Sequence, residues 1–146
     1  MDNTTTEQKP LTDDEILSAF DADSKARAKE RDEAIKASDV AAIKELTKLR
    51  AANPGVEFVI LGDNSGGPFR GVFEAPSPEA WSGFQREARS ENQRPLAGRN
   101  LVVRCLRWPA PTELEAANKR KPGLYNVLSN ALVIEAGSGV EANVKK

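Results

Sequence analysis

Few side chains in this sequence could support catalysis. The 146 residues include no histidine and a single cysteine, Cys105. Without histidine the commonest general base is missing, and the Ser–His and Cys–His pairs of nucleophilic enzymes are excluded. A structural zinc site is not expected either. Carboxylates remain, but Asp63 and Glu74 flank a predicted turn, where acidic residues are common. We therefore predict a protein that is not an enzyme, with no catalytic residues, no metal and no cofactor.

Two further features resemble reactive or ligand-binding groups at first sight. Cys105 lies on the apolar arc of a predicted helix, so we interpret it as a small core residue rather than a reactive thiol. As a lone cysteine it excludes a disulfide within the chain. The glycine-rich stretch at 63–67 is not followed by Gly-Lys-Ser/Thr, and no helix begins at its end. We interpret it as a hairpin turn rather than a phosphate-binding loop.

Aromatic and arginine side chains offer recognition chemistry instead. Aromatic residues make up only 5% of the chain, yet both tryptophans and several arginines lie in one region after the predicted hairpin. Tryptophan and arginine are enriched at binding hot spots. We predict that Trp81, Phe84 and Trp108 lie near a partner or self-assembly surface, with Arg104 and Arg107 at its rim. Two alternatives stay open: the tryptophans belong to the core, and the arginines form an ordinary solvated helix face.

Composition narrows the class of protein. The length suits one domain, and 39% hydrophobic with 29% charged residues suit a modest core. The net charge of −1 gives no bulk attraction to nucleic acid or to an anionic membrane. No run of about 18 apolar residues predicts a membrane span, and the first residues lack the pattern of a signal peptide. We expect neither a membrane nor a nucleic-acid partner.

The first third of the chain is polar and predicts helices. Thr12-Asp-Asp-Glu15 has the pattern of a capping box. A charged stretch from 24 to 33 follows, which we interpret as a solvated helical tether because its apolar positions do not recur as in a coiled coil. Ser38 is predicted to cap a second helix at 39–52. Asn53-Pro-Gly55 ends it, since proline cannot continue the hydrogen-bond ladder.

The next segment predicts a β-hairpin. Residues 56–62 and 68–74 are rich in β-branched and aromatic residues and are separated by a turn. A hairpin alone is only marginally stable in water. It must therefore pack against helices or pair through its edges with another chain, which is a first indication of self-association.

Four short helices are predicted after the hairpin. Ser77 and Pro78 begin the first, residues 96–107 form the second, Pro111 begins the third and Pro122 the fourth, which Gly137 ends. The best amphipathic pattern in the chain is Leu124, Val127, Leu128, Ala131 and Leu132. The predicted fold is α+β and mostly α-helical: a β-hairpin followed by a compact bundle of short helices, with extended charged N-terminal helices.

These elements suggest a division of the chain. We expect a disordered N-terminus at 1–11, a charged helical arm at 12–53, a hairpin and helical core domain at 56–137, and a flexible tail at 138–146.

The order of these motifs resembles a known family. A hairpin ends in F-x-x-P-S and leads to a helix with W-x-x-F. A helix ending in L-V-x-x-C, a W-P stop, P-G-L and a terminal A-G follow. The pattern resembles the tail assembly chaperones of long-tailed bacteriophages. The residues that carry the resemblance are Phe73, Pro76, Ser77, Trp81, Phe84, Leu101, Val102, Cys105, Trp108, Pro109, Leu114, Pro122, Gly123, Leu124, Asn130, Leu132 and Gly137.

The resemblance implies a non-enzymatic role in virion morphogenesis. Such chaperones bind the long helical tape-measure protein in the host cytoplasm before the tail tube forms around it, and then leave. Tape-measure protein or other tail proteins would be the partners, and an apolar helix face with aromatic anchors suits helix-in-groove packing. Two alternatives stay open: a virion structural component of the connector or tail-completion type, and a nucleic-acid-binding regulator, against which the sequence pI of about 5.6 argues.

Overall fold

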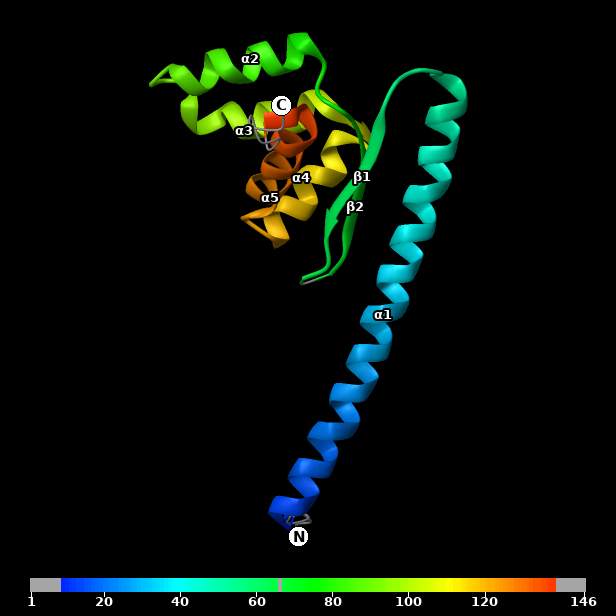
Figure 1. The fold of residues 1–146 in the computed structure, drawn as a ribbon. Helices are drawn as coiled ribbons and strands as arrows, with labels where there is room; N and C mark the ends of the chain where they lie inside the picture. Colours follow the sequence, from blue (N-terminus) through cyan, green and yellow to red (C-terminus); the bar gives the residue numbers. More distant parts are fainter. Residues whose placement is uncertain (1–8, 66, 139–146) are drawn as a thin grey trace, which may run out of the picture. The chain divides into compact units, whose positions relative to one another are not determined.

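The computed structural model describes residues 9–65 and 67–138 (Figure 1). These residues form a mostly helical α+β fold with a small antiparallel sheet and a long N-terminal helix, which confirms the predicted fold class. The elements in chain order are α1 (Asp13–Ala52), β1 (Phe58–Asp63), β2 (Phe69–Glu74), α2 (Pro78–Arg89), α3 (Arg94–Cys105), β3 (Leu106–Trp108), α4 (Pro111–Arg120), α5 (Leu124–Val133) and a π-helical turn η1 (Ile134–Ser138).

The chain divides into two compact units between Glu33 and Ala34, inside α1. In the first unit the predicted capping box is confirmed. The Thr12 N–H donates to Glu15 Oε1 at 2.9 Å, and the Glu15 N–H donates to Thr12 Oγ1 at 3.1 Å. These bonds lower the pKa of the Glu15 carboxyl. The apolar side chains of Ile16, Leu17 and Phe20 that follow are exposed, Phe20 at 67%.

The predicted break between two N-terminal helices is wrong. Ser38 does not cap a new helix, because α1 runs without interruption from Asp13 to Ala52. No proline or glycine lies within that range, and alanines around Ser38 favour helix on both sides. A residue that could serve as an N-cap therefore does not interrupt a helix when the residues on both sides of it favour helix. The predicted stop after Ala52 is confirmed, with Gly55 at a φ of 87°.

The sheet has the strand order β1-β2-β3, and both pairs are antiparallel. The predicted hairpin is confirmed, with Phe58 opposite Glu74 at one end. The third strand was not predicted. The expected helix at 96–107 ends at Cys105, and the next residues pair with β2, Trp108 lying opposite Val72. Pairing between distant segments outweighs the local helical pattern here.

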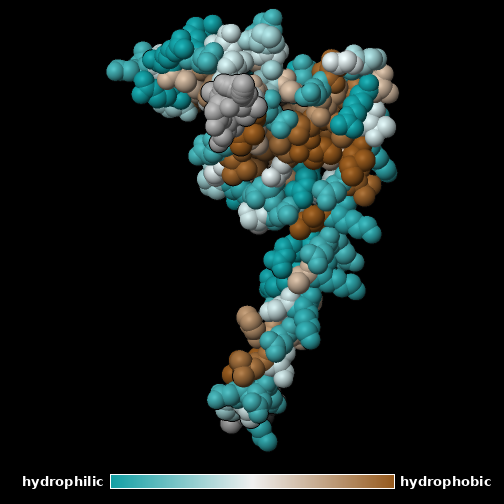
Figure 2. All heavy atoms as spheres, in the orientation of Figure 1, coloured by the Kyte–Doolittle hydropathy of each residue, from teal (hydrophilic) through white to brown (hydrophobic). Residues whose placement is uncertain are grey.

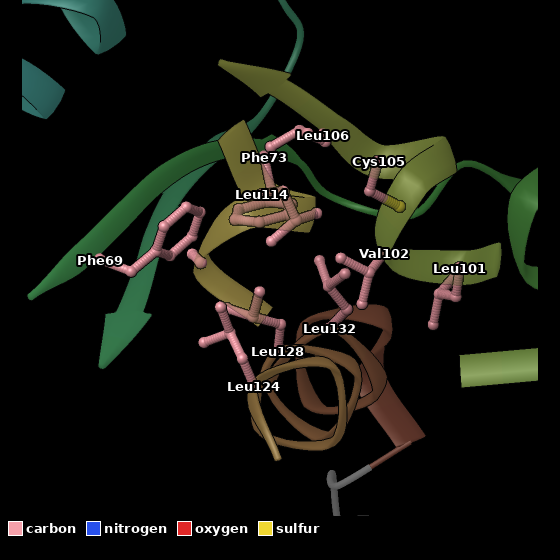
Figure 3. Close-up of a cluster of buried hydrophobic side chains, with 11 residues drawn as sticks. Phe69, Phe73, Leu101, Val102, Cys105, Leu106, Leu114, Leu124, Leu128 and Leu132 are labelled. Carbon is pink, nitrogen blue, oxygen red and sulfur yellow. The ribbon is translucent and has the colours of Figure 1, made fainter. Parts of the chain in front are cut away.

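Each face of the sheet packs against a different helical layer. One face contributes Phe69 and Phe73 to the main core with α3, α4 and α5, as Figure 3 shows. The other contributes Phe58 and Val72 to a smaller cluster with Ala42 of α1. The buried members of the main core are Phe69, Phe73, Leu101, Val102, Cys105, Leu106, Leu114, Ala117, Leu124, Leu128 and Leu132. The alternation of side chains along β2 thus supplies both layers.

The short helices begin and end close to their predicted positions. The Ala80 N–H donates to the Ser77 hydroxyl at 3.1 Å, so Ser77 is the N-cap of α2 as predicted. The last helix begins at Leu124, two residues after Pro122. Of its predicted apolar face, Val127 is instead 48% exposed. Gly137 takes a φ of 90° within η1, where a left-handed conformation favours glycine.

Some expectations fall outside this description. Residues 1–8 and 139–146, which make up most of the predicted terminal segments, lie outside the described residues. The boundaries of the predicted arm and core domain stay predictions. Among the helices that the structure describes, none is long and apolar enough to cross a membrane.

Candidate binding surface

Trp81 and Phe84 form an aromatic pair on α2. Their ring centroids are 5.3 Å apart with an interplanar angle of 29°, a stacked arrangement. Phe84 packs against the main core, together with Ala80. Both aromatic side chains are half-buried. The pair therefore joins the edge of the core to the surface and leaves part of both rings accessible to a partner.

Arg104 lies beside this helix but carries an intramolecular ion pair. Its Nη2 donates to Glu87 Oε2 at 2.5 Å and its Nη1 to Glu87 Oε1 at 3.2 Å. The Arg104 hydrogen bonds lower the pKa of the buried Glu87 carboxyl. Gly83 makes room for the guanidinium, since a Cβ there would lie 3.1 Å from Arg104 Nη1. The ion pair of Arg104 with Glu87 thus connects α3 to α2.

Arg107 is also paired within the chain. Its Nε and Nη2 donate to Glu74 Oε1 of β2 at 3.2 and 3.1 Å. Its Nη1 donates to the backbone carbonyl oxygens of Arg104 and Leu106. The guanidinium is 37% exposed at the side-chain level. It can meet a partner at the surface, but its charge is already compensated by a carboxylate.

Trp108 lines a groove between α1 and α4. The groove has a volume of about 410 Å³ and is formed by the second half of α1, the start of β2, the residues after β3, and α4. Its lining residues are Ala37, Ser38, Ala41, Pro68, Phe69, Arg70, Trp108, Pro109, Glu113, Ala116, Ala117 and Arg120. Trp108 also packs against the small cluster around Ala42, so it is partly core and partly groove wall.

The two helical walls of the groove are lined by small side chains. Ala37 and Ala41 are one turn apart on α1, and Ala116 and Ala117 occupy the facing side of α4. Small side chains allow another helix to approach closely, at the short end of the usual 8–10 Å interaxial range. Together with Phe69 and Trp108, these alanines give the groove a partly apolar lining.

Charged groups border the same groove. Arg70 is held in place, since its Nε donates to Asp39 Oδ1 at 2.6 Å and its side chain is only 12% exposed. Glu113 and Arg120 have no ion-pair partner within the described ranges and lie two turns apart along α4. They offer opposite charges at two positions of the rim, which would fix the direction of a bound segment.

The five predicted residues therefore fall into two groups by their contacts. Trp81, Phe84 and Arg104 belong to α2 and α3, whereas Arg107 and Trp108 belong to β3. Arg104 and Arg107, which we predicted at the rim, each have a glutamate partner within the chain. Their place at the rim of a partner surface stays a prediction. Sequence reasoning missed the alanine walls. Alanines one turn apart are visible in the sequence, but nothing local indicates that α1 and α4 border one groove.

The groups considered for catalysis have structural contacts. Cys105 is 2% exposed, and burial raises the pKa of its thiol to about 11. This confirms it as a core residue. The hydrogen bond from the Ser65 hydroxyl, at 2.7 Å, lowers the pKa of Asp63, which also lies 3.4 Å from Lys121 Nζ. Glu74 accepts from Arg107 as described.

Fold and surface together describe a small α+β protein with a groove between α1 and α4. No known protein family and no curated protein matches the sequence. Among solved structures, an uncharacterised protein from Bacillus stearothermophilus is similar, with a TM-score of 0.51 and 23% sequence identity. The alignment covers 68% of this chain and 99% of that one. At this identity the similarity shows a shared fold.

Proposed function

We propose that this protein is a non-enzymatic binding protein that acts as a tail assembly chaperone of a long-tailed bacteriophage, in the cytoplasm of the host. Its client is the tape-measure protein, an extended helical chain that must not self-associate before the tail tube forms. The order of motifs described above supports the family, and the groove at Trp108 supports a helical client.

The groove is the observation that carries the proposal. Its lining combines alanines from α1 and α4 with the aromatic side chains of Phe69 and Trp108, and it also includes the charged Glu113 and Arg120. Peptide helices commonly bind by placing an apolar stripe into such a groove. Many weak contacts along one long client would allow later displacement by tube subunits. The aromatic pair of Trp81 and Phe84 offers a second contact.

A substitution that fills the groove tests the mechanism. Ala116 is exposed and lines the groove, so Ala116→Leu should leave folding intact and obstruct the client. We expect at least a tenfold loss in client affinity, which corresponds to about 1.4 kcal/mol. The matched control is Ala51→Leu, the same change at an exposed position of α1 outside the groove.

The first experiment is affinity capture of the tagged chain from phage-producing bacteria, followed by mass spectrometry. We expect a large helical tape-measure protein to be captured by the wild type and by Ala51→Leu, less by Ala116→Leu, and we expect no copy of this chain in purified particles. Capture of neck or tail subunits with the chain retained in particles would favour a structural component. Capture of nucleic acid alone would refute the proposal.

A further inference from the structure

β1 is a terminal strand of the sheet, so one of its long edges has no strand neighbour in the described part of the chain. Its first five residues, Phe-Val-Ile-Leu-Gly at 58–62, contain no charge and no proline. Exposed edges are normally protected by charges, prolines, bulges or a covering element. Residues 58–62 carry no charge and no proline, and their register with β2 has no bulge. Such a strand is suited to pairing with another chain.

The phase of the β1–β2 ladder decides which backbone groups face the open edge. The Ala75 N–H donates to the Glu57 carbonyl at 2.9 Å. Bonded and non-bonded pairs alternate in an antiparallel ladder, so Val59 and Leu61 bond to β2. The residues whose N–H and C=O groups point to the open edge are Phe58, Ile60 and Gly62.

Apolar side chains lie on both faces of this edge. Val59 and Leu61 pack partly against the main core, and Ile60 packs partly against the cluster around Ala42. Val127 of α5 is 48% exposed and borders the end of β1 at Asp63. Figure 2 shows hydrophobic atoms gathered on the visible face where Figure 1 draws the hairpin and α5. A strand added here would gain side-chain contacts as well as backbone bonds.

We infer that a second copy of this chain pairs with the β1 edge, antiparallel and across a two-fold axis at Ile60, so that two sheets join into one. The axis places Ile60 opposite Ile60 of the second copy. The outward-facing backbone groups of Phe58, Ile60 and Gly62 then lie opposite outward-facing groups of the other strand, as an antiparallel ladder requires. Phe58 then lies opposite Gly62, the largest side chain opposite the smallest, and Val59 lies opposite Leu61. The strand is thus complementary to itself, which selects a second copy over an unrelated strand.

The charges at the ends of this pairing are compatible with it. Glu57 of one copy lies opposite Asp63 of the other, and like charges across strands are unfavourable. Asp63 is already compensated, since Lys121 Nζ lies 3.4 Å from its Oδ2 and 3.2 Å from its carbonyl oxygen. The buried lysine therefore reduces the repulsion at both of the symmetric Glu57–Asp63 contacts of the two-fold pairing.

Proline at the centre of the edge tests the inference. The Ile60 N–H faces outward, so Ile60→Pro removes no bond to β2 but removes the central donor to a second copy. By light scattering we expect twice the chain mass for the wild type and for the control Ile60→Val, and the single chain mass for Ile60→Pro at the same concentration. A wild type of single mass up to millimolar concentration, or an unchanged dimer in Ile60→Pro, would overturn the inference.

Wild-type measurements decide the matter if the proline variant does not fold. We expect the amides of Phe58, Ile60 and Gly62 to exchange slowly in the dimer and to lose protection on dilution, whereas Val59 and Leu61 stay protected. In a mixture of labelled and unlabelled chains, an intermolecular contact should join the α-protons of Val59 and Leu61. Fast exchange of the outward amides at high concentration, or a dimer without this contact, would place the interface elsewhere and refute the pairing.

Discussion

Replacement of Ala42 by leucine should separate the second half of α1 from the sheet. Ala42 is the buried residue of that long helix, with an exposure of 0%. It packs against Phe58 and Val72, with Leu46 and Leu49 at the border of the same cluster. A leucine has no space there, because a methyl group already fills the contact between helix and sheet. The added atoms must move the helix or force side chains from their preferred rotamers.

The size of the effect follows from the cost of overpacking. Extra methylene groups in a filled core typically cost about 1–3 kcal/mol. Alanine and leucine differ little in helix propensity, so the loss arises from the Ala42 contact itself. A domain of this size has a free energy of unfolding of about 5–15 kcal/mol. The melting temperature should therefore fall by roughly 3–15 °C.

Urea unfolding, followed by circular dichroism and by tryptophan fluorescence, measures this loss. Trp108 packs against the same cluster, so its fluorescence reports the contact directly. The matched control is Ala34→Leu, the same substitution at an exposed position of α1, which should stay within about 0.5 kcal/mol of the wild type. If both variants unfold alike, Ala42 is not packed between α1 and the sheet, and the two-layer arrangement is wrong.

Three further predictions concern a core leucine, the ion pair between Glu87 and Arg104, and the buried cysteine. Leu128→Ala, at 0% exposure, should cost about 2–5 kcal/mol in urea unfolding, whereas Val127→Ala beside it should cost much less. Glu87→Gln should lower the free energy of unfolding by about 1.5 kcal/mol at pH 7. Arg104 lowers the pKa of Glu87 in the folded chain. The difference in stability between wild type and variant should therefore be complete above pH 4.5 and become smaller as the pH falls below that value. Cys105 should react with a disulfide reagent at pH 8 far more slowly in the folded chain than in urea, since burial raises the pKa of its thiol to about 11; equal rates would refute its burial.

Much of the local structure could be read from neighbouring residues. The capping box at Thr12 and Glu15, the N-cap at Ser77 and the stop at Pro54 all act within about four residues, where the chain has little choice of partner. The hairpin followed from two β-branched runs around a turn. The core positions Leu124, Leu128 and Leu132 followed from helical periodicity.

The same local signals failed where a distant contact competed. Ser38 has the features of a cap, yet the surrounding helix formers carried α1 through it. Leu106 and Arg107 lie within the predicted helix, yet the strand that they begin pairs with β2, which lies more than thirty residues earlier in the chain. A sequence pattern weighs only the neighbours of a residue, and these choices depended on segments that meet after folding.

The candidate surface shows the same division. Sequence reasoning selected Trp81, Phe84 and Trp108 because they are large aromatic residues. The three-residue spacing of Trp81 and Phe84 was sufficient to place both on one face of one helix. The glutamate partners of Arg104 and Arg107 lie 17 and 33 residues away, and the alanine walls at Trp108 come from α1 and α4. Ion pairs and grooves depend on distances across the fold, so residue types specify what can bind, while the packing of the layers determines where.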